Sequence, residues 1–136
     1  LSSGLRDKPC VALQSDILVK APGESFAAFP DASVVCGQPV LEPHEKNPAL
    51  TNPVVVVEVL SASTEEFDRG EKFERYRAIP TLQDYVLVSQ DRRLIEVFSR
   101  SAEWQPRAAV PGEAVELASI DVTLSVDDLY DNPLAR

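Results

Sequence analysis

The chain has 136 residues, of which 44% are hydrophobic and 26% charged, and its formal net charge is −9 at pH 7. This size and composition fit one globular domain with a single core. No apolar stretch approaches the roughly 20 residues that cross a bilayer, so a membrane span is excluded. The excess of acids argues against broad, non-specific binding to polyanions.

The chain begins at Leu1 and contains no methionine, which indicates a fragment or a processed product. No secretion signal opens it, so we expect a cytoplasmic location. Two cysteines, Cys10 and Cys36, are too few for a disulfide scaffold and are expected to be reduced thiols.

The first half of the chain predicts short strands. One or two strands are expected within 11–19, and an apolar strand over 32–36. The segment 37–53, GQPVLEPHEKNPALTNP, is rich in proline and asparagine and is predicted to be a mobile loop. The run VVVVEVL at 54–60 is dense in β-branched residues, which favours a strand.

The second half predicts a helix followed by more strands. The helix should cover about 64–78, because N-cap residues precede it and Pro80 cannot continue it. Strands at 84–89 and 94–99, edge strands at 104–110 and 113–117, and a short helix at 125–130 are expected after it. This order predicts a single α/β (α+β) domain over 1–136, in which a strand–helix–strand unit and an antiparallel hairpin share a mixed sheet.

Glu58 interrupts the apolar strand 54–60, and a buried carboxylate without a partner is costly. One face of the helix should pack on the sheet. It consists of positions 65, 69, 72, 76 and 79, and it carries cations. That face carries Arg69 and Lys72, whereas Asp68, with Glu71, Glu74 and Arg75, falls on the opposite, solvated face.

Two interpretations of Glu58 follow from these residues alone. A buried salt bridge with Lys72 or Arg69 would tie the helix to the sheet. Alternatively, Glu58 belongs to a catalytic site, since perturbed acids also gather there. Asp31, at the mouth of the strand 32–36, favours the second interpretation, because two carboxylates supply the hard oxygen ligands that Mg²⁺ prefers.

Several segments together resemble one family. They are FPDASVV at 29–35, VVVEVLSAST at 55–64, DRGEK at 68–72 with Tyr76, DYVLV at 84–88 and LIEVF at 94–98. In this order they are similar to the Uma-two family, also known as domain of unknown function 820, within the PD-(D/E)XK nuclease superfamily. The resemblance runs from about residue 10 to the end of the chain.

The resemblance implies a restriction-endonuclease-like mixed sheet and a site for Mg²⁺ or Mn²⁺. Asp31 and Glu58 would bind the metal, and Lys72 would replace the lysine that the superfamily carries two residues after the acid, where this chain has Leu60. Tyr76 and Arg69 would support the pocket or the substrate. Family members also carry a helical region with another acid upstream, so we expect this domain to be truncated at its N-terminus.

We therefore expect a Mg²⁺-dependent endonuclease that cleaves DNA, acting as a possible homodimer. With the metal bound, the two carboxylates would neutralise it and Lys72 would leave the pocket positive. The alternative is an inactive nuclease-fold domain that associates with proteins or nucleic acid. Convergence of Asp31 and Glu58 on one metal position would favour the enzyme, and closure of Glu58 by Lys72 without solvent access would favour the alternative.

Overall fold

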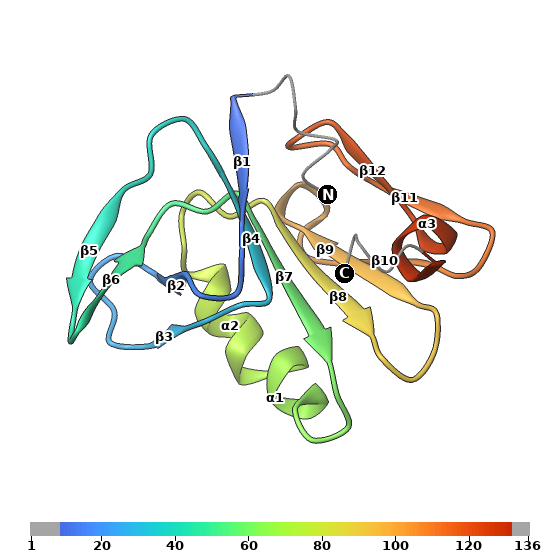
Figure 1. Cartoon of the computed structure of the whole chain (residues 1–136), viewed down its shortest axis with the longest axis horizontal. Helices are drawn as coiled ribbons and strands as arrows, with labels where there is room; N and C mark the ends of the chain where they lie inside the picture. The colour runs from blue at the N-terminus through green and yellow to red at the C-terminus, as the bar shows by residue number, and fades with distance from the viewer. Residues whose placement is uncertain (1–8, 132–136) are drawn as a thin grey trace.

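A computed structural model describes residues 9–131 of the chain. Its centre is a six-stranded sheet with the order β1-β4-β7-β8-β9-β10 (Figure 1). The strands of this sheet are β1 (Cys10–Leu13), β4 (Ala32–Cys36), β7 (Val55–Leu60), β8 (Asp84–Ser89), β9 (Ile95–Ser99) and β10 (Pro106–Ala109). A mixed sheet of this kind confirms the fold class expected from the sequence.

Two smaller sheets and three α-helices complete the described chain. The four-stranded sheet β3-β2-β6-β5 contains β2 (Leu18–Lys20), β3 (Ala27–Ala28), β5 (Leu41–His44) and β6 (Asn47–Leu50). The two-stranded sheet pairs β11 (Ala114–Leu117) with β12 (Val122–Ser125). The helices are α1 (Glu65–Arg69), α2 (Glu71–Arg77) and α3 (Val126–Asp131), and a 3-10 turn covers Arg100–Ala102.

Strands β7 and β8 form the parallel pair of the central sheet, and the helices α1 and α2 connect them. A parallel pair needs such a crossover, whereas β8 and β9 are antiparallel and need only the short predicted turn. Both parallel strands end on the same side of the sheet, next to α1 (Figure 1). This end of β7 carries Glu58.

Both faces of the central sheet are covered, since successive residues of β7 belong to two different hydrophobic cores. Val55 belongs to a core that β11, β12 and α3 cover, while Val56 and Leu60 belong to a second core that includes Phe73 and Tyr76 of α2. Successive strand residues point to opposite faces, so Glu58 lies on the face of Val56 and Leu60. The side chain of Glu58 is therefore directed toward α2.

The predicted single helix is broken at Gly70, which separates α1 from α2. Glycine is a poor residue for a helix interior because it loses the most backbone entropy. A side chain at this position would also be crowded, since a Cβ atom on Gly70 would lie 3.1 Å from the carbonyl oxygen of Glu66.

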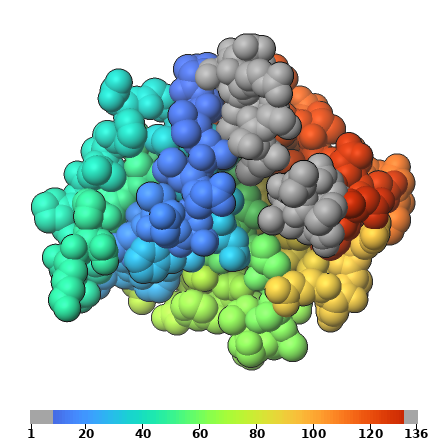
Figure 2. Space-filling model, viewed as in Figure 1, coloured from blue at the N-terminus to red at the C-terminus, as the bar shows by residue number. Residues whose placement is uncertain are grey.

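The prediction of a mobile loop over 37–53 was wrong, because this segment forms the β5–β6 hairpin. His44 pairs with Asn47 across a two-residue turn, in which Glu45 has a φ of 48°. Asn52 braces the base of the hairpin by accepting from the N–H of Val40 at 2.8 Å. The hairpin forms the teal flank of the molecule in Figure 2.

The prediction of reduced cysteines was also wrong. Cys10 on β1 and Cys36 on β4 are direct partners in the antiparallel register and form a disulfide. They are 26 residues apart in the sequence, so only the strand pairing brings them together.

No helix within residues 9–131 is long and apolar enough to cross a membrane.

Candidate functional site

Glu58, Lys72 and Tyr76 meet where β7 packs against α2. The Lys72 Nζ lies 3.0 Å from Oε2 of Glu58, which confirms the predicted contact between strand and helix. Tyr76 donates its hydroxyl hydrogen to the same carboxylate oxygen at 3.0 Å. Glu58 is 3% exposed and Tyr76 is 1% exposed, so both groups interact away from bulk water.

Asp68 joins this cluster, which contradicts its predicted place on a solvated face. It is 2% exposed, and its Oδ1 lies 3.3 Å from the Lys72 Nζ. Residues four apart share one face even of a continuous helix, so the assignment of Asp68 to the face opposite Lys72 was wrong on helix periodicity itself. The spacing of Asp68 and Lys72, four residues apart, was the sequence signal for this pair.

Burial raises the pKa of Glu58 from its ordinary value near 4.5 to about 7, against the opposing effects of Lys72 and Tyr76. Burial also acts to lower the pKa of Lys72, but the hydrogen bond and charge of Glu58 and the charge of Asp68 outweigh it, and the pKa is raised. Lys72 therefore remains an ammonium ion at neutral pH, while Glu58 can gain or lose a proton there.

Asp31 is exposed and lies at the end of β4 nearest this cluster. Its Oδ2 accepts a hydrogen bond from the backbone N–H of Val59 at 2.6 Å. The antiparallel register pairs Ala32 with Val57. Extending it by one residue, back along β4 and forward along β7, places Asp31 opposite Glu58. Residues directly opposite in an antiparallel pair have their Cβ atoms about 5 Å apart on one face. The two predicted metal ligands are thus neighbours.

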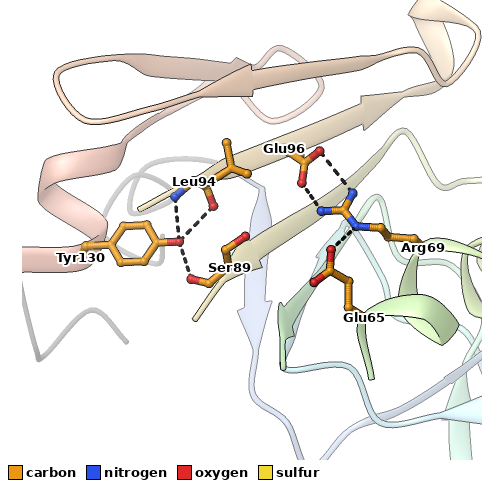
Figure 3. Close-up of polar contacts among 6 residues, drawn as sticks. All are labelled: Glu65, Arg69, Ser89, Leu94, Glu96 and Tyr130. Carbon is orange, nitrogen blue, oxygen red and sulfur yellow. Dashed lines mark hydrogen bonds and ion pairs between the residues drawn. The ribbon is translucent and has the colours of Figure 1, made fainter. Parts of the chain in front are cut away.

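Arg69 is not part of this cluster. Its guanidinium binds Glu96 of β9 through two hydrogen bonds of 2.5 and 3.2 Å, and binds Glu65 at 2.8 Å (Figure 3). The two bonds to Glu96 tie α1 to the central sheet. A role of Arg69 in substrate binding stays a prediction and requires these ion pairs to open.

The donor set at the end of β7 fits a divalent cation by charge. Within residues 9–131 no group of three or more histidine, cysteine or acidic side chains is arranged to hold a metal ion. The smaller set of Asp31 and Glu58 still provides adjacent carboxylates, the ligands that Mg²⁺ prefers. When Glu58, Asp31 and Asp68 are all ionised, their charges and the single ammonium of Lys72 sum to −3 + 1 = −2.

With these acids ionised, a divalent ion would leave the site neutral rather than positive, because Asp68 adds a charge that the sequence-based expectation did not count. A hollow of about 270 Å³ lies elsewhere on the surface and contains none of the predicted site residues. It is lined by Ala21, Glu24, Phe26, Glu71, Glu74, Arg75 and Ala78. The site at Glu58 is therefore defined by its buried charges rather than by a large cavity.

Comparison with known proteins places the sequence in a family. Residues 1–127 match the model of a family described as "Uma2: Putative restriction endonuclease". Two relatives come from Synechocystis sp. (strain ATCC 27184 / PCC 6803 / Kazusa), "Uncharacterized protein slr1290" and "Uncharacterized protein sll1609". The first is 34% identical over 89% of this chain, and the second is 36% identical over 62%. The chain spans 63% and 47% of their respective lengths.

A solved structure shares the fold. It is the crystal structure of a putative nuclease belonging to DUF820 from Anabaena variabilis ATCC 29413, with a TM-score of 0.71 and 17% sequence identity. The similarity covers 96% of this chain and 73% of that one. The family match extends over nearly the whole sequence, and the chain belongs to the Uma2 family of putative restriction endonucleases.

Proposed function

We propose that this protein is an endonuclease that cleaves DNA phosphodiester bonds with Mg²⁺ or Mn²⁺. The observation that carries the proposal is the pair of buried carboxylates at the end of β7, Glu58 and Asp68, which share the single ammonium group of Lys72, with Asp31 at the adjoining end of β4. Membership of the Uma2 family supports DNA as the substrate.

In the proposed mechanism, Asp31 and Glu58 hold the metal ion. The ion would polarise a phosphoryl oxygen and lower the pKa of a bound water. Lys72 positions the attacking water, and Tyr76 keeps the carboxylate of Glu58 oriented through its hydrogen bond. Glu58 and Tyr76 are buried away from bulk water, which strengthens the electrostatic interactions of the Glu58 carboxylate.

A second candidate function has its own observation. Lys72 and Tyr76 contact Glu58, whose side chain is only 4% exposed, and this closure favours an inactive nuclease-fold domain that associates with protein or nucleic acid. In that case the ion pair would only tie α2 to β7. We favour the enzyme because a structural ion pair needs one acid, whereas Lys72 contacts two and Asp31 is adjacent.

The proposal is tested by nicking of supercoiled plasmid DNA with the purified protein. We expect nicking with Mg²⁺ or Mn²⁺ and none with EDTA, since the carboxylates would repel the phosphate without a cation. Equal nicking in EDTA would contradict the metal mechanism. No nicking with either metal would favour the inactive domain.

Replacement of Lys72 by alanine should slow cleavage but spare metal binding. The ammonium group positions water in the proposed mechanism and is not a metal ligand, so the loss affects the rate. Single-turnover nicking and Mn²⁺ titration calorimetry measure the two effects separately. A variant that lost Mn²⁺ binding would place Lys72 in the support of the metal site instead.

A homodimer remains a prediction. Strands β1 and β10 are the edges of the central sheet, and such edges can pair between two copies of a protein. The predicted contact region, 104–117, includes β10. Light scattering at tens of micromolar protein should give twice the chain mass of 14.9 kDa, and a monomeric mass would refute the dimer.

A further inference from the structure

Lys72 lies between two carboxylates that belong to different parts of the fold. Its Nζ is 3.0 Å from Glu58 on β7 and 3.3 Å from Asp68 on α1. The three side chains are 14% exposed or less. The ammonium therefore bridges the two acids, and it stays paired with Asp68 if Glu58 is withdrawn from it.

The two carboxylates are not equivalent. Glu58 accepts a hydrogen bond from Tyr76, and it follows Val57, the partner of Ala32, so that extending the register places it opposite Asp31. Asp68 belongs to α1 rather than to that strand pair, and its buried Oδ1 has no hydrogen-bond donor among the described residues. The ion pair with Lys72 is the contact that this oxygen makes at 3.3 Å.

Asp68 is also held in place. Tyr85, a fully buried residue of β8, donates its hydroxyl hydrogen to the backbone carbonyl of Asp68 at 2.7 Å. This bond fixes the end of α1 against the sheet. Asp68 is thus anchored through its backbone beside the ammonium group of Lys72.

A metal ion at Asp31 and Glu58 has to displace Lys72 from the Oε2 of Glu58. An ammonium group left in this buried place without an anion would oppose metal binding, because an unpaired buried charge is strongly destabilising. We propose that Asp68 is the positioning residue that retains the Lys72 ammonium when Glu58 turns to the metal, so that the lysine stays beside the reacting phosphate. This inference rests on the proposed function.

The test is Mn²⁺ titration calorimetry on the wild-type protein, Asp68→Asn, Lys72→Gln and the double variant. Asp68→Asn should weaken Mn²⁺ binding about tenfold when Lys72 is present, and about twofold or less in the Lys72→Gln background, where no ammonium is displaced. Asp68→Glu should restore part of the affinity, because it returns an anion. Glu66→Gln removes the same charge from an exposed position of α1 and should bind Mn²⁺ like the wild type.

Each result decides the proposal. An equal loss from Asp68→Asn in both backgrounds would mean that Asp68 acts on the metal directly, and this would overturn the lysine exchange. Unchanged affinity in the Asp68→Asn variant, with thermal unfolding as a check of folding, would also overturn it. A wild-type protein that binds Mn²⁺ but does not nick DNA refutes the proposed function, while the same titrations still decide the role of Asp68. Absence of Mn²⁺ binding would refute both.

Discussion

Glu58→Gln and Asp31→Asn are each expected to lower Mg²⁺-dependent plasmid nicking by at least about a hundredfold. Each replaces a charged metal ligand with a neutral amide of nearly the same shape. The amide oxygen is a weaker ligand for Mg²⁺, and the site loses one of the charges that balance the ion. Nicking rates at saturating metal, measured for both variants beside the wild type, check this expectation.

Both variants should remain folded. The cluster carries −2 when its acids are ionised, so removing one negative charge relieves repulsion. The glutamine at position 58 retains an oxygen for the Tyr76 hydroxyl, and circular dichroism should match the wild type. Glu66→Gln, which removes an exposed acid nearby, is the matched control and should keep full activity. A Glu58→Gln variant with wild-type nicking would show that Glu58 does not hold the metal.

The strands around the site could be predicted from the sequence because their signals are local. The valines of β7 specify a buried strand, and Asp31 directly precedes the strand β4, so its place at a strand end follows from the chain itself. The contact between Glu58 and Lys72 was predicted from helix periodicity alone. It holds at 3.0 Å because α2 is an uninterrupted helix from Glu71 to Arg77.

Asp68 was a miss that the sequence could have prevented, because it lies four residues before Lys72 and this spacing puts both side chains on one side of a helix. The other missed features depend on strand pairing. Cys10 and Cys36 meet through the β1–β4 register, which no local pattern encodes. The two prolines of the β5–β6 hairpin, Pro43 and Pro48, lie opposite one another, which local composition cannot distinguish from an irregular loop.

The stability of the protein should fall between pH 5 and pH 8 because of Glu58. Its pKa is about 7 in the folded protein against 4.5 ordinarily, so the folded state binds this proton more tightly than the unfolded chain does. The resulting stability is fully present below pH 4.5 and is lost as the pH rises through about 7. The pKa difference corresponds to at most about 3 kcal/mol. The raised pKa of Lys72 affects stability only near and above pH 10.5, outside this pH range.

Glu58→Gln isolates this contribution, because glutamine does not titrate and His44, the single histidine, is common to both proteins. Urea unfolding followed by the fluorescence of Trp104, which packs against Phe73, gives the free energy of unfolding at each pH. The free energy of unfolding of the wild type, relative to that of the variant, should fall by about 1–3 kcal/mol from pH 5 to pH 8. Mg²⁺ at pH 8 should restore stability to the wild type only, since a ligand that binds the folded state stabilises it. Parallel profiles for the two proteins, with and without Mg²⁺, would contradict both the buried titration of Glu58 and its role as a metal ligand.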